Sequence, residues 1–166
     1  MAPSKVVLFR HGEKADGDGL TPLGYYRAFL LSNLLSQRYP SMKGIYAAGT
    51  GPGDSSVRKI QTVTPLINKM LIINPGLAIN TVYINFQYKE AAHEILTAEL
   101  FTNRIVLVCW SHTSIPPFAK TLGAINVPHK WPGNRFDMIW EIDMYTKELI
   151  QIPQLLLPGD TNIAIR

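Results

Sequence analysis

Cysteine is almost absent from this sequence: Cys109 is the only one, and it lies inside a short apolar segment. A single cysteine can form neither an intrachain disulfide nor a cysteine-based zinc site. Burial raises the pKa of a thiol, so we expect Cys109 to be a small core residue rather than a nucleophile. The lack of disulfides fits a protein of a reducing compartment.

Long apolar runs are missing as well. No stretch approaches the roughly 20 residues that a membrane-spanning helix requires. The first five residues lead directly into a short apolar segment, without the longer apolar core of a signal peptide. We therefore expect a cytoplasmic protein that does not bind a membrane.

Charged residues are also few, at 17% against 46% hydrophobic residues, a balance typical of globular proteins. The 166 residues suffice for one core, so we expect a single domain over residues 1–166. The net charge is +4, but lysine and arginine are scattered without a basic run. This argues against nucleic acid and favours a small anionic ligand. No heptad or long edge strand indicates an oligomeric state.

Short apolar segments alternate with segments of helical periodicity along the chain. We expect strands at residues 6–9, 44–48, 79–82, 104–110, 136–142 and 148–152, with the last two forming a hairpin. We expect helices at residues 21–39, 54–70, 88–101 and 114–122. Strands that alternate with helices predict an α/β fold: a three-layer α/β/α sandwich with a mostly parallel central sheet.

Local signals mark where these helices begin and end. Thr21 followed by Pro22 is an N-cap followed by proline in the first turn, and Asp54 or Ser55 is expected to cap the second helix. Pro65 falls within that second helix and is expected to kink or restart it. The periodicity of the first helix predicts a buried face made of Leu23, Tyr26, Leu30, Leu31, Leu34 and Leu35.

Polar residues follow the two most apolar strands at the point where each strand ends. Arg10, His11 and Glu13 come directly after the first strand, and His112 follows the fourth. The carboxyl ends of parallel strands are where open α/β sheets place their sites. A polar turn exposed to solvent would give the same pattern, and His112 could simply bind a backbone carbonyl.

Arg58 is a third candidate because it lies early in a helix after a glycine-rich loop. An arginine fork binds phosphate oxygens in pairs, and a neutral imidazole can attack phosphorus. Arg58 could instead be a solvated surface residue. Taken together, Arg10, His11, Arg58 and His112 predict a pocket for a phosphoryl group and its transition-state charge.

Four motifs between residues 6 and 122 resemble the histidine phosphatase superfamily, also called phosphoglycerate mutase-like. They are Arg10-His11-Gly12-Glu13, Thr21-Pro22-Leu23-Gly24, the segment Ser56 to Thr62, and Val108-Cys109-Trp110-Ser111-His112. The resemblance implies that His11 is the nucleophile and forms a phosphohistidine. It implies that Arg10, Arg58 and His112 surround the phosphoryl group, and that Glu13 orients the site from its edge. It also implies that no metal or other cofactor is required.

The sequence departs from this family pattern at three places. Thr113 follows the second histidine, where glycine is common, and Lys59 stands where a small residue is usual. The general acid is either Glu90 or Glu94, and we favour Glu90 because it lies nearer the loop. Both carboxylates would equally suit the amino end of a helix, and some small members of the family lack the acid.

The resemblance predicts a phosphatase that hydrolyses a small phosphomonoester or a phospho-amino acid. A mutase must exclude water, and the short loops here favour an open site and hence a phosphatase. A non-catalytic domain that binds a phosphorylated ligand is a further alternative. The loop at residues 127–136 could line the rim, although we favour a packed loop.

An iron site formed by His11, Glu13 and His112 is a rival hypothesis from another class. Two histidines and one carboxylate are the ligands that such a site requires. Arg10 beside the cation disfavours it, as does the helical pattern between the strands.

Overall fold

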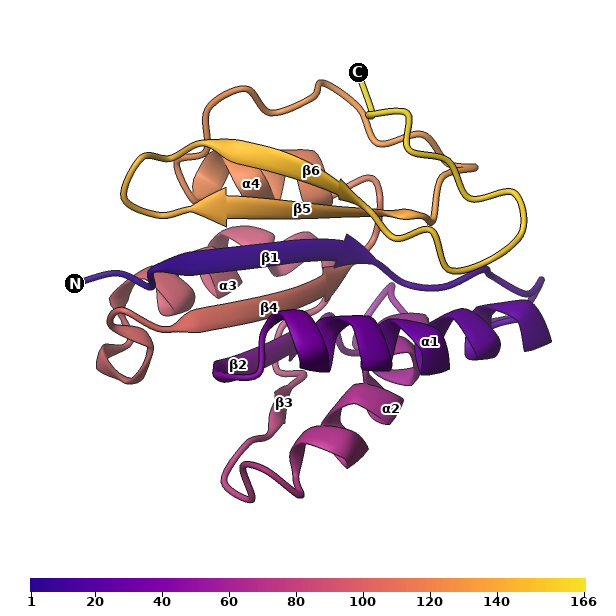
Figure 1. Ribbon diagram of the computed structural model, residues 1–166, viewed down its shortest axis with the longest axis horizontal. Helices are drawn as coiled ribbons and strands as arrows, with labels where there is room; N and C mark the ends of the chain where they lie inside the picture. The colour runs from indigo at the N-terminus through magenta and orange to yellow at the C-terminus, as the bar shows by residue number, and fades with distance from the viewer.

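The structure is a computed structural model that describes all 166 residues. A six-stranded mixed sheet with the order β3-β2-β4-β1-β5-β6 forms its middle layer (Figure 1). The strands are β1 (Lys5–Arg10), β2 (Met42–Ala47), β3 (Ile79–Asn80), β4 (Ile105–Trp110), β5 (Met138–Asp143) and β6 (Leu149–Pro153). Strands β1 to β4 run parallel to one another, and β5 is antiparallel to both of its neighbours, β1 and β6. The predicted mostly parallel sheet and the terminal hairpin are confirmed.

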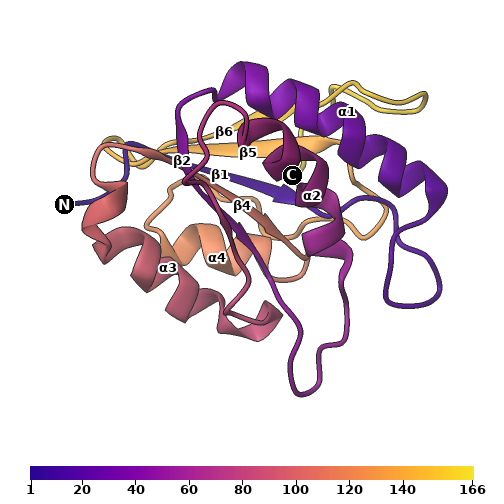
Figure 2. The ribbon, with the colours of Figure 1, turned by 90° about the horizontal axis from the view of Figure 1, so that it is seen from below.

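Helices cover both faces of this sheet, which confirms the three-layer sandwich. The α-helices are α1 (Pro22–Arg38), α2 (Arg58–Met70), α3 (Tyr88–Thr97) and α4 (Ile115–Thr121), and the 3-10 helices are η1 (Asn85–Gln87) and η2 (Glu99–Phe101). Figure 2 shows α1 and α2 on one side of the sheet and α3 and α4 on the other. Each side has its own buried apolar cluster. None of the helices is long and apolar enough to cross a membrane.

Strand β1 lies near the middle of the sheet and is buried on both faces. Val7 packs with the α1–α2 cluster, and Leu8 packs with the α3–α4 cluster. Burial on both faces explains why this strand is an unbroken apolar run rather than an alternating one. Its neighbour β4 is parallel, so the residues after β1 and after β4 meet at the same edge of the sheet.

Helix α1 begins as predicted, and its predicted buried face is confirmed in part: Leu31 and Leu35 are buried. The Thr21 hydroxyl accepts a hydrogen bond from the Gly24 backbone N–H at 3.0 Å, which confirms the cap. Leu23 and Tyr26 of the predicted face are 51% and 54% exposed. Arg27 is buried instead, because polar partners far away in the sequence surround its guanidinium.

The predicted caps of helix α2 are wrong. The helix begins at Arg58, and neither Asp54 nor Ser55 caps it. The Asp54 carboxylate accepts the backbone N–H groups of Ser56 and Asn85, and the Ser55 hydroxyl donates to Asp18. Because both side chains are engaged in these other hydrogen bonds, neither of them caps the helix.

Three further features differ from the prediction: the course of α2 past Pro65, the length of the helix that begins at residue 88, and the length of β3. Helix α2 continues through Pro65 to Met70 without a restart. The predicted helix over residues 88–101 is divided at Ala98, whose extended backbone separates α3 from η2. Strand β3 is shorter than predicted. Gly123, with φ of +90°, lies directly after the last turn of α4, as expected for a C-cap.

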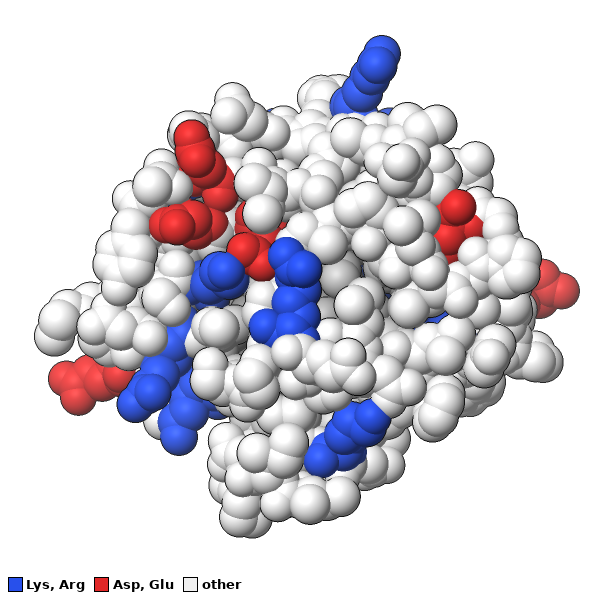
Figure 3. Space-filling model, in the orientation of Figure 1, with Lys and Arg blue, Asp and Glu red and all other residues white.

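Charged side chains form separate groups of both signs on the face that Figure 3 shows, and much of that face is uncharged. Lys5 and Glu141 form an ion pair near the beginning of β1, with the ammonium 2.6 Å from a carboxylate oxygen. The side chains that follow β1 and β4 lie at the opposite end of these strands.

Candidate active site

His11 lies directly after β1, and its backbone N–H donates to the Trp110 carbonyl of β4 at 3.3 Å. The side chain is 4% exposed. Its Nδ1 lies 2.7 Å from the Gly12 carbonyl oxygen. A carbonyl can only accept, so Nδ1 carries the proton and Nε2 carries the lone pair. The backbone therefore fixes the tautomer that a nucleophilic Nε2 requires.

Gly12 allows three elements to meet behind the imidazole. A Cβ on Gly12 would lie 2.7 Å from the Gly24 carbonyl oxygen, so only glycine permits this approach of α1. The Gly12 N–H donates to the Thr62 hydroxyl at 2.9 Å, and that hydroxyl donates to the Arg58 carbonyl at 2.7 Å. Thr62 of α2 thereby supports the His11 loop, a role that sequence reasoning missed although Thr62 lies within a quoted motif.

The imidazole of His11 is neutral at physiological pH. Burial is the main cause that lowers its pKa to about 3. The Gly12 carbonyl opposes this shift, while Arg10, Lys59 and Arg58 add to it. Because the ring is not protonated at neutral pH, the lone pair on Nε2 is available.

The low pKa of His11 predicts how stability depends on pH. An unfolded chain protonates this imidazole below its ordinary pKa of 6.5, whereas the folded protein resists protonation down to about 3. The unfolded state then binds more protons, so the free energy of unfolding falls as pH is lowered through this window. Each additional proton contributes about 1.4 kcal/mol per pH unit.

Urea unfolding of wild type and His11→Asn between about pH 6.5 and about pH 4.5 measures this dependence. The variant is expected to show the shallower slope. His93→Asn, which changes an exposed histidine on α3, is the control and should retain the wild-type slope. Equal slopes for wild type and His11→Asn would contradict the prediction.

Arg10 is a buried cation with unused donors. Its side chain stacks on the Phe136 ring at 3.8 Å, and its Nη1 donates to the carbonyls of Gly133 and Arg135 at 2.8 Å each. Burial lowers its pKa to about 10, so it stays protonated at neutral pH. Its Nε and Nη2 are buried without any partner. Two free donors of one guanidinium match the paired oxygens of a phosphate.

A cavity of about 180 Å³ lies beside His11. Its walls come from the loop before α2, the first turn of α2, η1 and the residue after β4. The lining residues are His11, Gly53, Asp54, Ser56, Arg58, Lys59, Asn85, Phe86 and Ser111. The structure thus places His11 and Arg58 in the wall of one cavity, which Arg10 and His112 do not line.

Arg58 is held by the loop that follows the His11 motif. Its Nε donates to the Gly19 carbonyl at 3.1 Å, and its Nη2 donates to the carbonyls of Ala15 and Gly17. These hydrogen bonds fix the guanidinium at the cavity wall. They also occupy part of its capacity to bind an anion.

His112 lies at the edge of a neighbouring cavity of about 210 Å³. That cavity is lined by His112, Thr113, Pro116, Pro117, His129, Lys130 and Trp131, while the preceding Ser111 lines the cavity of His11. The Nδ1 of His112 is buried without a partner. Burial, followed by the charge of Arg10, lowers its pKa to about 4. His112 is therefore a neutral imidazole that does not line the cavity beside His11.

The loop at residues 127–136 serves two roles. Trp131 is buried against Trp140, with ring centroids 4.8 Å apart, as a packed loop requires. His129 and Lys130 line the cavity that contains His112. Trp131 packs in the core and also lines that cavity, so this loop is both packed and part of a cavity wall.

Glu13 is bound from behind the site by Arg27. The Nε of Arg27 donates to a Glu13 oxygen at 2.8 Å, and its Nη1 and Nη2 reach Gln154 at 2.9 Å and Asp160 at 2.7 Å. Burial alone would lower the pKa of Arg27, but its acidic partners raise it overall. Sequence reasoning missed Arg27, Gln154 and Asp160. The one signal was a charged residue among the apolar positions of α1.

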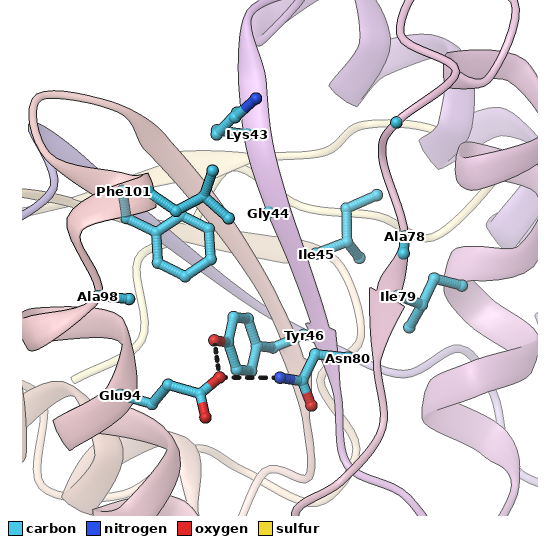
Figure 4. A pocket seen from close by; sticks show the side chains of 12 residues that line it. Lys43, Gly44, Ile45, Tyr46, Ala78, Ile79, Asn80, Glu94, Ala98 and Phe101 are labelled. Carbon is cyan, nitrogen blue, oxygen red and sulfur yellow. Dashed lines mark hydrogen bonds between the residues drawn. The ribbon is translucent and has the colours of Figure 1, made fainter.

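The structure does not bring either candidate for the general acid to His11. Glu90 is exposed on α3 and lines a separate cavity with Tyr83 and His93. Glu94 accepts hydrogen bonds from Tyr46 and Asn80 in a fourth cavity, of about 390 Å³ (Figure 4), and another from Tyr83. The carboxylate that does line the His11 cavity is Asp54.

No group of three or more histidine, cysteine or acidic side chains is placed to hold a metal ion. The Glu13 carboxylate of the hypothetical iron site is paired with Arg27 at 2.8 Å.

Comparison with known proteins identifies the fold. The sequence matches no family model and no curated protein. The structure is similar to one described as the phosphohistidine phosphatase SixA from Agrobacterium tumefaciens, with a TM-score of 0.57 and 20% identity over 92% of this chain and 97% of that chain. The SixA protein histidine phosphatase complexed with tungstate gives a TM-score of 0.51 and 15% identity over 90% and 97%.

A third similar structure is the phosphoserine phosphatase from Entamoeba histolytica, in complex with 3-phosphoglyceric acid. It gives a TM-score of 0.54 and 16% identity over 92% of this chain and 99% of that chain. All three similarities extend over nearly the whole of both chains. The chain has the fold of the histidine phosphatase superfamily, as its motifs predicted.

Proposed function

We propose that this protein is a metal-independent phosphatase that hydrolyses a phosphomonoester or a phospho-amino acid through a phosphohistidine on His11. The observation that carries the proposal is the state of the imidazole. Its Nδ1–H is fixed by the Gly12 carbonyl, and Nε2 makes no hydrogen bond within the protein. The same ring lines a small cavity together with Arg58 and Lys59. A neutral nucleophile beside fixed cations suits attack on a phosphoryl group.

The reaction has two displacements at phosphorus. In the first, Nε2 of His11 forms a bond to phosphorus, and the bond to the leaving group breaks with its electron pair. In the second, water attacks phosphorus, the P–N bond breaks, and inorganic phosphate leaves with the neutral imidazole restored. Arg10 and Arg58 stabilise the charge on the phosphoryl oxygens in both steps.

The environment of Asp54 favours one class of leaving group. Its two carboxylate oxygens accept backbone N–H groups at 3.2 Å each, and one of them lies 3.8 Å from the Lys59 ammonium. Both oxygens therefore act as hydrogen-bond acceptors, and Asp54 is not arranged to donate a proton to a leaving group. Phosphohistidine suits such a site, because its imidazole is a better leaving group than an alkoxide and can take its proton from water. Of the similar structures, one is described as a phosphohistidine phosphatase and another as a protein histidine phosphatase.

Hydrolysis is favoured over transfer to a second acceptor because the site is accessible. Phe86 at the cavity wall is 66% exposed, so this part of the wall opens to solvent. Water can then reach the phosphorylated histidine, whereas a mutase must exclude it.

The test is to trap the covalent intermediate. Protein mixed with an aryl phosphate in the presence of a metal chelator is quenched in alkali, digested and analysed by mass spectrometry. We expect a base-stable, acid-labile phosphate on the peptide that contains His11, together with release of the aryl alcohol. Turnover without phosphate on that peptide would contradict the mechanism. Phosphate binding without turnover of aryl phosphate or phosphohistidine would indicate a non-catalytic binding domain instead.

A further inference from the structure

Lys59 is a buried lysine with an unusual position. It follows Arg58 in the first turn of α2, and its side chain is only 3% exposed. Lysine is almost never fully buried unless it is paired. The little surface it retains lies against the same cavity as His11. The flexible stem of lysine therefore runs through the protein interior and ends at the site.

The ion pair of Lys59 is weak for so buried a charge. Its ammonium makes no hydrogen bond of 3.5 Å or less, and its one acidic neighbour is an Asp54 oxygen at 3.8 Å. That oxygen already accepts the Ser56 backbone N–H. An ammonium has three donors, and burying it costs several kcal/mol unless close partners compensate. Consistently, burial is the main cause that lowers the pKa of Lys59.

Arg27, another buried cation of this protein, shows how a fully paired buried charge is stabilised. Arg27 makes four hydrogen bonds, to Glu13, Gln154 and both oxygens of Asp160. Arg10 keeps two unpartnered nitrogens and lies next to His11. Lys59 resembles Arg10 rather than Arg27, because its ammonium has hydrogen-bond donors without partners. It also lines the cavity beside His11.

We propose that the Lys59 ammonium binds the phosphoryl group directly, as a third cation beside Arg10 and Arg58. This inference rests on the proposed function. Arg58 has donors committed to the carbonyls of the loop at residues 15–19, so the cavity gains a free donor from Lys59. Asp54 holds the ammonium near the cavity without neutralising all of its donors. Arg58 and Lys59 line the cavity, and Arg10 adds a third cation next to His11 without lining it. Against the Asp54 carboxylate these three cations leave a net charge of +2 around the imidazole, which matches a phosphoryl dianion.

The experiment measures the affinity for inorganic phosphate by isothermal titration calorimetry. Lys59→Gln removes the charge, and Lys59→Met fills the buried volume with an apolar chain. We expect both variants to bind phosphate about 10- to 100-fold more weakly, as loss of a hydrogen bond to a charged group implies. We also expect a higher KM for an aryl phosphate. Lys120→Gln, which removes an exposed lysine of α4, should bind phosphate like wild type.

A purely structural role for Lys59 would be to neutralise Asp54, and a double-mutant cycle separates the two roles. If Lys59 binds phosphate itself, Lys59→Gln weakens phosphate binding in the Asp54→Asn background as well. If it only neutralises Asp54, then Asp54→Asn/Lys59→Gln binds phosphate as tightly as Asp54→Asn, and the inference is overturned. Thermal unfolding of each variant shows that it is folded when measured.

The outcome also separates this inference from the proposed function. If wild type binds phosphate and Arg58→Ala weakens that binding while Lys59→Gln and Lys59→Met do not, the role of Lys59 is wrong and the phosphatase proposal stands. If wild type neither binds phosphate nor hydrolyses phosphorylated compounds, both proposals fail together.

Discussion

His11→Ala is expected to fold like wild type and to lose turnover by a factor on the order of 10⁴ or more, the scale seen when a covalent nucleophile is removed. The variant cannot form the P–N bond, and the alanine leaves the Arg10 and Arg58 cations in place. Phosphate binding should therefore persist while hydrolysis disappears. Steady-state hydrolysis of an aryl phosphate and calorimetric phosphate binding measure the two properties separately.

The control is His93→Ala, because His93 is exposed on α3 and lies outside the His11 cavity. This variant should retain wild-type kinetics. Added imidazole should restore part of the turnover of His11→Ala, since a free imidazole can occupy the space of the missing ring. Near-wild-type turnover of His11→Ala without imidazole would show that another group attacks the phosphoryl group.

Arg27→Met is expected to destabilise the protein by about 3–5 kcal/mol, the cost of leaving buried charges without their partner. The change leaves Glu13 and Asp160 as carboxylates that are mostly buried and have lost their cation. Arg38→Met is the matched control on the same helix. Arg38 is 43% exposed and lies 3.8 Å from Glu141, a geometry typically worth less than about 1 kcal/mol.

Urea unfolding at neutral pH measures the difference between the two arginine variants. Asp160→Asn added to Arg27→Met should recover part of the lost stability, because it removes one of the orphaned charges. Turnover should fall as well, since Glu13 is only two residues from His11 and loses its anchor. If Arg27→Met lost no more stability than Arg38→Met, the network would not be structural.

The order of the elements was predictable from the sequence because short-range signals determine it. Thr21 and Pro22 form a cap with their own neighbours, and the apolar run of β1 reflects burial on both faces. The position of His11 after that strand follows from the same pattern. Such features depend on residues that are only a few positions apart in the chain, so a single sequence is enough to predict them.

Features that depend on distant partners were not predictable. The predicted buried face of α1 was only partly right, because it did not include Arg27, which is stabilised by Asp160, 133 positions away. The predicted cap of α2 was wrong because Asp54 accepts a hydrogen bond from the backbone of Asn85, 31 positions away. In the sequence, Lys59 was only a departure from the family pattern. Its burial beside the cavity depends on the three-dimensional structure.

The position of β1 has a consequence for synthesis on the ribosome. This strand is made first, yet both of its neighbours in the sheet, β4 and β5, are made about a hundred or more residues later. A nascent chain must therefore carry an unpaired apolar segment through most of translation. Contacts so distant in sequence form slowly, and exposed apolar strands promote aggregation in the meantime. His11 consequently becomes ordered late, after the strands that enclose it have emerged.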